Sequence, residues 1–490
     1  MDYFVTQYSI DSPPGAVRAV LEDTIMQKNY PATAGSKILE NFISPLDATV
    51  ITKLEMAGVS ILGKTKTDEF GAAGLFNAAG LFYTVECGTN NSIPVSGAVA
   101  AVADGVAEIA LCNDYTGMIS EQANRNGLYY IHPTYGTVSR YGLIPAVSSM
   151  DQIGVVCRAP ADGFRILEII AGYDPKDGAM FSKAAPQYAM RKAKPGDEGT
   201  ATPCADGNPK PENMQSAMRE NVLVAKRGGG GTGESEDEES AKCEGGGTAG
   251  TGGTKYRTPD SGLRIGIPVN VFSQGQDTSV IAELRRNYKT VDFELKYFDV
   301  FAQVMQILCC AELSNNITRY DGIKFGYRAA GFRNLHELYT KTRTEAFGYY
   351  TKLAAITGAM VLAKKNYSRY YDKAMRIRRL ITESLDFTAY DAIVMPCAGV
   401  PPTGTALNAP PTSLAPDSPP TGFALDAPPT SLAPDSPPTG FAPDAPPTSL
   451  ALYALSRLCG LPSATVPFSG GGVTFIADRL REDVLIQCIH

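Results

Sequence analysis

Residues 31–70 read PATAGSKILENFISPLDATVITKLEMAGVSILGKTKTDEF, and they contain the apolar run Val59–Leu62, which resembles a β-strand. A second run of this kind, Ile153–Val156, also predicts a strand. The segment Ala98–Leu111 is rich in alanine and valine, and it predicts a buried helix. We therefore expect residues 12–180 to form a globular α/β unit.

Beyond this unit the composition changes twice. Residues 181–261 contain few apolar side chains and include RGGGGTGESEDEESAKCEGGGTAGTGGTK, so they cannot bury enough surface to offset the entropy of ordering. We expect a surface insertion that is disordered in part. Apolar patterns resume at residue 262. They predict strands within LRIGIPV and DAIVMP and helices over 278–297, 301–318, 333–366 and 367–386.

A proline-rich repeat follows. APPTSLAPDSPPTGFALD begins at Ala409, recurs almost unchanged at Ala427 and returns in part at Ala445, a period of 18 residues. Its Pro-Pro steps favour polyproline II and exclude helices and sheets. We interpret it as an expanded surface loop, with a docking strip for an aromatic groove as the alternative. The predicted parts are 1–180, 181–261, 262–408, 409–448 and 449–490.

Composition excludes several classes of function. The net charge of −7 gives no overall basic footprint for nucleic acid, although Arg376, Arg378 and Arg379 are a candidate local patch; a solvated helix face is the alternative interpretation. Ten cysteines without a CxxC pair and only three histidines argue against a zinc site and favour reduced, buried thiols. No apolar run is long enough for a membrane span. We expect no metal and no cofactor.

Several motifs together resemble the amidase signature family, and within it the A subunits of the glutamyl-tRNA(Gln) amidotransferases. Besides residues 31–70, they are HPTYGTVSRYGLIPAVSSMDQIG (132–154), IIAGYDPKD (169–177), LRIGIP (263–268), AELSNNITRYDGIKFGYRAAG (311–331), ELYTKTRTEAFG (337–348) and GLPSATVP (460–467). The resemblance implies one α/β/α fold, in which a large twisted mixed sheet is flanked by helices.

The resemblance also implies a site built from a lysine, a bridging serine and an attacking serine. The motifs place the lysine at Glu22, the bridging serine at Pro94 and the nucleophile at Met118, and they place Thr116 at an oxyanion glycine. A carboxylate, an imino ring and a thioether cannot perform these roles. We therefore expect no catalytic residues and a pseudoenzyme rather than an enzyme.

Neighbouring side chains offer a rearranged amidase site as an alternative. The candidate hydroxyls and thiols are Ser92, Ser96, Ser120, Cys87 and Cys112, and the lysine nearest to Glu22 in sequence is Lys28. The family positions that hold the glutamine head group correspond to Met305, Ala354 and Leu450. We also expect Asp114 to anchor the turn before Met118, His132 to be a packed side chain, and Tyr129 and Tyr130 to fill the altered site.

From these features we predict a structural or assembly subunit of a larger organellar complex, such as the mitochondrial ribosome. The alternatives are a component of a glutamyl-tRNA(Gln) amidotransferase complex that resembles its A subunit, and an amidohydrolase with a rearranged site. The expected partners are other protein subunits, with an indirect association with RNA and none with DNA or the membrane interior. The expected location is the mitochondrion, with the plastid as the alternative.

Overall fold

The computed structural model of the protein describes residues 3–8, 13, 15–76, 96–181, 262–272, 278–397, 449–468 and 471–489. The predicted insertion, apart from Phe181, and the proline-rich repeat at 409–448 lie outside the described residues, so their predicted disorder and loop character stay predictions.

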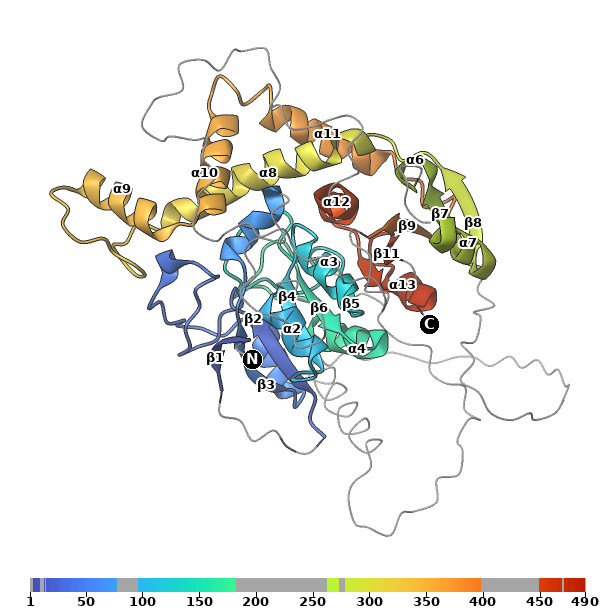
Figure 1. The fold of residues 1–490 in the computed structure, drawn as a ribbon, viewed down its shortest axis with the longest axis horizontal. Coiled ribbons are helices and arrows are strands. Elements are labelled where there is room, and N and C mark those ends of the chain that lie inside the picture. The colour runs from blue at the N-terminus through green and yellow to red at the C-terminus, as the bar shows by residue number, and fades with distance from the viewer. Residues whose placement is uncertain are drawn as a thin grey trace, which may run out of the picture.

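The described strands join into one 11-stranded mixed sheet with the order β1-β3-β2-β4-β6-β5-β10-β11-β9-β7-β8 (Figure 1). They are β1 (Phe4–Gln7), β2 (Arg18–Glu22), β3 (Ser60–Thr65), β4 (Ile109–Asn113), β5 (Tyr129–His132), β6 (Ile153–Cys157), β7 (Arg264–Pro268), β8 (Lys289–Phe293), β9 (Ala392–Pro396), β10 (Ser463–Val466) and β11 (Val473–Ala477). β2 pairs in parallel with β3 and β4, and β7 with β8 and β9, whereas the central pairs from β4 to β9 are antiparallel.

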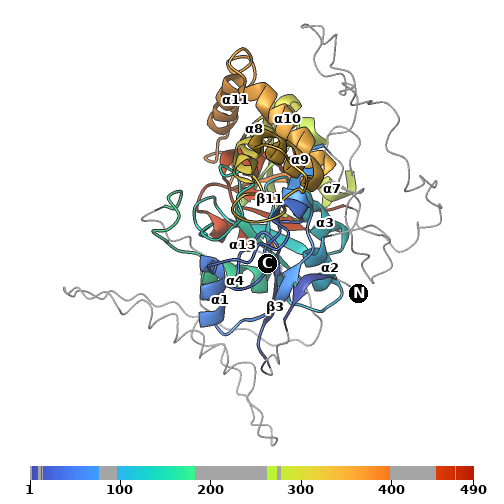
Figure 2. The ribbon, with the colours of Figure 1, turned by 90° about the vertical axis from the view of Figure 1, so that its left-hand side faces the viewer.

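Helices cover both faces of the sheet (Figures 1 and 2). They are α1 (Thr49–Met56), α2 (Gly97–Ala103), α3 (Met118–Arg125), α4 (Pro160–Ile170), α6 (Val269–Phe272), α7 (Thr278–Asn287), α8 (Phe301–Asn316), α9 (Leu335–Ala346), α10 (Tyr349–Leu362), α11 (Tyr371–Glu383), α12 (Ser449–Cys459) and α13 (Glu482–Ile489).

Alternation along the strands divides the apolar core between the two faces. On β4, Ile109 and Leu111 join the cluster that contains α1, α4 and α13, whereas Ala110 and Cys112 join the cluster that contains α2 and α3. Successive side chains of a strand point to opposite faces, so the sheet has a helical layer on each side. The predicted α/β/α fold with a flanked mixed sheet is therefore confirmed.

Most of the predicted elements are present, but three were wrong in part. The helix predicted over 333–366 is divided into α9 and α10 by Phe347 and Gly348. The helix predicted over Ala98–Leu111 ends at Ala103, and its second half is β4. The helix predicted over 278–297 ends at Asn287 and is followed by β8. Short apolar runs suit a buried helix and a buried strand equally, and the turns that separate them carry little periodicity.

The thiols agree with one further prediction within the described ranges. All seven cysteines there are free and buried, as expected of reduced core thiols. Among the residues that the structure describes, no helix has the length and apolar character needed to cross a membrane.

Candidate functional site

The candidate site lies where β2 ends, beside the ends of β3 and β4. Glu22 is the last residue of β2 and is only 4% exposed. Its carboxylate accepts hydrogen bonds from the Thr67 hydroxyl at 2.6 Å, the Asn113 backbone N–H at 2.6 Å and the Thr24 hydroxyl at 3.1 Å. The carboxyl group is therefore fixed by three donors from three different segments.

This environment makes Glu22 titrate near neutrality. Burial raises its pKa to about 7, the charge of Asp114 also raises it, and the hydrogen bonds from Thr67, Asn113 and Thr24 oppose the shift. A carboxyl group with this pKa is divided between its acid and its base at neutral pH, which is the condition for accepting and returning a proton. The Thr67 hydroxyl is close enough to be the group that exchanges it.

The neighbouring acid, Asp23, is part of a buried ion pair. Its carboxylate lies 2.8 Å from Lys64 Nζ, and both side chains are fully buried. Lys64 also donates to the carbonyl of Pro31 at 2.7 Å, and Asp23 accepts from the backbone N–H of Thr33 at 2.9 Å. Burial lowers the pKa of Lys64, and the charge of Asp23 opposes this shift. The pair braces the loop that begins at Pro31 against β3.

A tight turn joins β4 to α3. Gly117 adopts a φ of 86°, which favours glycine, and it precedes Met118, the first residue of α3. Asp114 accepts from the backbone N–H groups of Ile119 at 3.2 Å and Ser120 at 3.0 Å. These bonds satisfy free donors at the start of the helix. The prediction that Asp114 anchors this turn is confirmed.

Met118 fills the space between this turn and the segment 69–76. It is 5% exposed, and a Cβ atom placed on Gly74 would lie 2.4 Å from its sulfur and 2.6 Å from Thr116 Oγ1. The backbone of Gly74 therefore touches the thioether closely, and no larger residue fits there without movement.

One buried charged side chain beside the candidate site was not predicted from the sequence. Arg457 of α12 is buried; its Nη2 lies 3.0 Å from an Asp114 carboxylate oxygen, and its Nε donates to the Asp114 carbonyl at 2.9 Å. It also donates to the hydroxyls of Ser120 at 2.9 Å, Ser456 at 2.7 Å and Ser463 at 3.0 Å. A signal for this side chain was available in the sequence, because Arg457 is the one charged residue in the otherwise apolar run SLALYALSRLCG. An arginine that is buried in such a run nearly always has an acidic partner.

The other hydroxyls and thiols that were candidates for a rearranged amidase site do not converge on one place within the described residues. Pro94, Ser92 and Cys87 lie outside the described residues. Ser96 caps α2 by accepting from the Val99 N–H at 3.3 Å, and Ser120 donates to Asp114 at 2.7 Å. Both hydroxyls are therefore engaged in structural bonds.

The remaining predicted positions are buried in the core, except for Lys28. Cys112 lies inside β4, and burial raises the pKa of its thiol well above the usual value. Met305, Ala354 and Leu450 are 0%, 0% and 2% exposed and belong to one apolar cluster. Lys28 is exposed and donates its backbone N–H to Asp47 at 2.8 Å. Met305, Ala354 and Leu450 complete the core around α8, α10 and α12.

Two aromatic predictions concern β5. Tyr130 is 1% exposed, and the Arg457 guanidinium lies 5.9 Å from its ring centroid. His132 is 1% exposed, and burial lowers its pKa well below the usual value. The packed state predicted for His132 is confirmed, and Tyr130 occupies the sheet face that carries Cys112. Tyr129 is half-buried and packs against the apolar cluster on the opposite face of the sheet, so the expectation that it fills the altered site was wrong.

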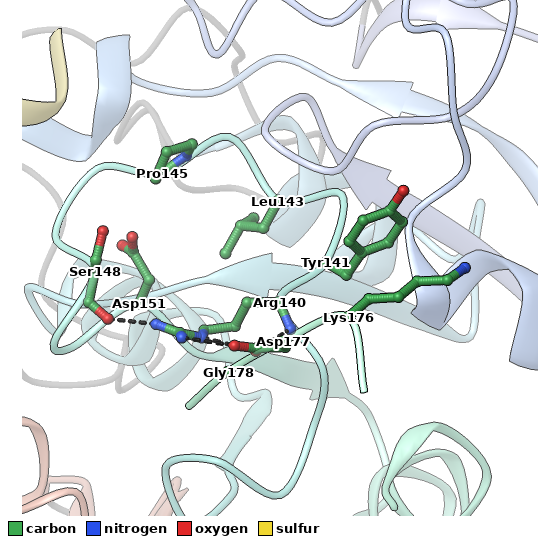
Figure 3. A pocket seen from close by; sticks show the side chains of 9 residues that line it. All are labelled: Arg140, Tyr141, Leu143, Pro145, Ser148, Asp151, Lys176, Asp177 and Gly178. Carbon is green, nitrogen blue, oxygen red and sulfur yellow. Dashed lines mark hydrogen bonds and ion pairs between the residues drawn. The ribbon is translucent and has the colours of Figure 1, made fainter. Parts of the chain in front are cut away.

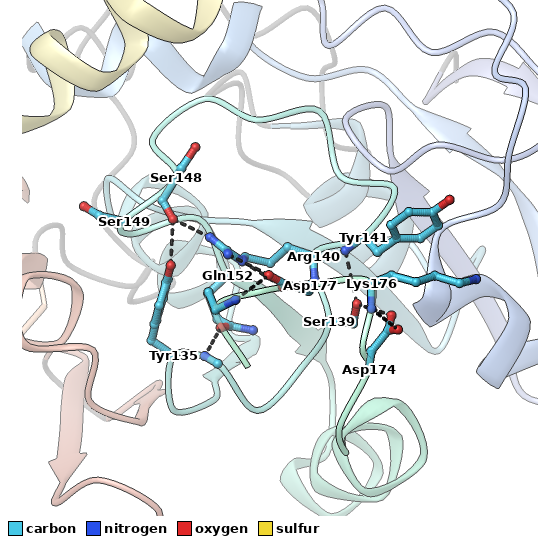
Figure 4. Close-up of polar contacts among 12 residues, drawn as sticks. Tyr135, Ser139, Arg140, Tyr141, Ser148, Ser149, Gln152, Asp174, Lys176 and Asp177 are labelled. Carbon is cyan, nitrogen blue, oxygen red and sulfur yellow. Dashed lines mark hydrogen bonds and ion pairs between the residues drawn. The ribbon is translucent and has the colours of Figure 1, made fainter. Parts of the chain in front are cut away.

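A separate cavity of about 180 Å³ opens beside the segment 140–151 (Figure 3). Its lining residues are Arg140, Tyr141, Leu143, Pro145, Ser148, Asp151, Lys176, Asp177 and Gly178. The Arg140 guanidinium donates to Asp177 at 2.9 and 3.1 Å and contacts the Ser148 carbonyl, as Figure 4 shows. The centroid of the Tyr135 ring lies 4.9 Å from the Arg140 guanidinium. The cavity wall is therefore a bracing network rather than a set of free ligand-binding groups.

Within the part of the chain that the structure describes, no group of three or more His, Cys, Asp or Glu side chains could hold a metal ion. The expectation of no metal and no cofactor stays a prediction.

Comparison with known proteins identifies the family. The sequence profile of the family described as Amidase matches residues 16–226 and 254–430. The A subunit of the glutamyl-tRNA(Gln) amidotransferase of Lachnoclostridium phytofermentans is 35% identical over 401 residues, which cover 79% of this chain and 68% of the relative. Its counterpart from Trichodesmium erythraeum is 31% identical over 398 residues, covering 79% and 70%. The chain therefore belongs to the amidase family.

Solved structures share the fold. The A subunit of the glutamyl-tRNA(Gln) amidotransferase of Thermotoga maritima superposes with a TM-score of 0.59 at 22% identity, covering 99% of this chain and 85% of that one. A 6-aminohexanoate cyclic dimer hydrolase superposes with a TM-score of 0.55 at 16% identity, covering 96% and 83%. At these identities the likeness concerns the fold alone.

These findings correct one expectation. The prediction that the chain is not an enzyme was wrong, because relatives that are 31–35% identical over most of its length are A subunits of an amidotransferase. Glu22 and Met118 lack the family's atom types, but the carboxyl group of Glu22 accepts a hydrogen bond from the Thr67 hydroxyl, a group outside the three family positions.

Proposed function

We propose that this protein takes the place of the A subunit in a glutamyl-tRNA(Gln) amidotransferase complex. The observation that carries the proposal is the 35% identity to such a protein over 401 residues. Other protein subunits are the partners that this role requires. An exposed apolar face on α10, where Tyr349 is 63%, Ile356 66% and Met360 45% exposed, supports such contacts.

We further propose that Glu22, Pro94 and Met118 occupy the positions of the family's lysine, bridging serine and nucleophile. Since Met118 has no proton to lose, the amide chemistry then needs another hydroxyl. Thr67 donates to Glu22 at 2.6 Å, which is the geometry of a nucleophile and its general base. In this scheme the Thr67 oxygen attacks the amide carbonyl, Glu22 takes the hydroxyl proton and passes it to the departing ammonia, and water hydrolyses the acyl-threonine.

The test is ammonia release from glutamine by the full chain, by itself and after co-expression with the B subunit of an amidotransferase. Thr67→Val and Glu22→Gln are expected to abolish release, whereas Thr52→Val, a change at an exposed position of α1, keeps it. Because the base has a pKa of about 7, activity is expected to rise as pH increases through 7 and then to level off. Absence of ammonia release and of co-purification with the B subunit would refute the proposal.

A structural role in a larger organellar complex, such as the mitochondrial ribosome, is the rival assignment. Affinity purification of the native protein distinguishes the two: amidotransferase subunits are expected among its partners, and ribosomal proteins would favour the rival. The proposed location is the mitochondrion, with the plastid as the alternative, and organelle fractionation followed by immunodetection decides between them.

A further inference from the structure

The connection between α10 and α11, together with α11 itself, carries a concentration of positive charge. Residues 364–379 contain seven Lys or Arg and one Asp, although the whole chain has a net charge of −7. Figures 1 and 2 place this connection at the outer rim of the helical layer, away from the sheet. A cluster of positive charge on a protein whose net charge is negative is typical of a surface that binds a polyanion.

Of the cations on α11, one side chain points toward the core and the others point toward solvent. Arg378 donates to the carbonyl of Leu458 at 2.7 Å and to the Ser149 hydroxyl at 3.0 Å, on the side where Ala374 and Ile381 are buried. The other cations are exposed, and those on α11 recur every three residues, which places them on one face. We call these six the α11 basic patch: Lys364, Lys365, Arg369, Lys373, Arg376 and Arg379.

Acidic neighbours pair with two arginines of the patch. Arg376 pairs with Asp372 at 2.7 Å and Arg379 pairs with Glu383 at 2.6 Å, and the two arginines remain 76% and 80% exposed. Within the described ranges, no ion pair involves the three lysines of the patch. The patch therefore keeps a net positive charge that its own helix does not compensate.

Tyrosine rings lie among these cations. Tyr367 is 44% exposed, and its ring centroid is 5.2 Å from that of Tyr371. The Arg369 guanidinium lies 5.5 Å from the Tyr370 ring centroid. Aromatic rings between basic side chains are typical of surfaces that bind single-stranded nucleic acid, where bases stack on the rings and phosphates meet the cations.

We propose that the α11 basic patch binds the phosphate backbone of single-stranded RNA, with Tyr367 stacking on a base. RNA fits better than an anionic membrane because α11 exposes Arg376 and Arg379 paired with acids, whereas a membrane-binding helix exposes a continuous apolar face. This site goes beyond the proposed amidotransferase role and is tested separately from it, because RNA binding and ammonia release are independent measurements.

The test is binding of a fluorescein-labelled, unstructured 20-nucleotide RNA to the full chain, measured by fluorescence anisotropy at two salt concentrations. Each phosphate contact contributes about −0.7 to the slope of log affinity against log salt concentration. With six contacts, the affinity is expected to fall about 300-fold between about 50 and 200 mM salt. Lys364→Gln, Lys365→Gln and Lys373→Gln together halve the contacts, so the triple variant is expected to lose only about 20-fold over the same range.

The matched control changes three exposed lysines on other elements, Lys289, Lys296 and Lys324, to glutamine. It is expected to keep the wild-type salt slope, and circular dichroism checks that both triple variants remain folded. Equal slopes for wild type and the patch variant would overturn the proposal.

Tyr367→Leu separates RNA from other polyanions. It is expected to weaken RNA binding about tenfold and to leave binding of heparin, which has no bases, unchanged. If the substitution changes neither, or if phosphatidylserine vesicles bind through the same lysines while RNA does not, the RNA assignment is wrong.

Discussion

The buried arginine of α12 offers the sharpest test of how the candidate site is held together. Arg457→Met keeps most of the side-chain volume but removes the guanidinium that bonds to Asp114. The Asp114 carboxylate would then be a buried charge without its cation, although Ser120 still donates to it from its backbone N–H and its hydroxyl. The Asp114 carbonyl and the hydroxyls of Ser456 and Ser463 would also lose a donor.

Removing one partner of a buried ion pair costs about 3–5 kcal/mol. Natural domains have a free energy of unfolding of about 5–15 kcal/mol, so Arg457→Met is expected to remove about a fifth of the stability or more. At an m-value of about 3 kcal/mol/M, the urea midpoint falls by about 1 M or more. The chain contains no tryptophan and 24 tyrosines, so unfolding is followed by tyrosine fluorescence and circular dichroism.

The matched control is Arg333→Met, because Arg333 is 88% exposed and pairs with Glu337 on the surface. Exposed pairs contribute about 1 kcal/mol or less, so this variant is expected to unfold close to the wild-type midpoint. If the two variants shift the midpoint equally, the argument that Arg457 anchors the turn before α3 is refuted.

Three further predictions concern the same region. Burial raises the pKa of Glu22 in the folded chain to about 7, so between about pH 4.5 and 7 the unfolded chain binds fewer protons than the folded one. The free energy of unfolding therefore falls by about 3 kcal/mol as pH rises through this window. Glu22→Gln is expected to remove this dependence on pH in denaturation curves measured across the window. Lys64→Met leaves the buried carboxylate of Asp23 without its cation and is expected to lower the free energy of unfolding by about 3–5 kcal/mol. The double variant Lys64→Met with Asp23→Asn is expected to lower it by less, and equal losses would contradict a buried ion pair. Gly74→Ala is expected to cost about 1–3 kcal/mol by overpacking against Met118, and a double-mutant cycle with Met118→Ala is expected to show favourable coupling; additive effects would exclude the contact.

The regular elements whose residues interact locally were largely predictable. Val59–Leu62 and Ile153–Val156 match β3 and β6, because a short apolar run bounded by turn residues suits a buried strand. The helix predicted over 301–318 is α8. By contrast, Ala98–Leu111 contains a helix and a strand, and local pattern does not separate two buried elements of similar composition.

The motifs of the sequence were sufficient to determine the family and the α/β/α class, since each motif is a local arrangement of residue types. Only the tertiary structure decided which side chains meet at the site. Arg457 reaches Asp114 across 343 positions, and Thr67 reaches Glu22 across 45. Such contacts depend on the order of strands in the sheet and on the placement of α12, and these follow from the packing of the whole core rather than from any local pattern.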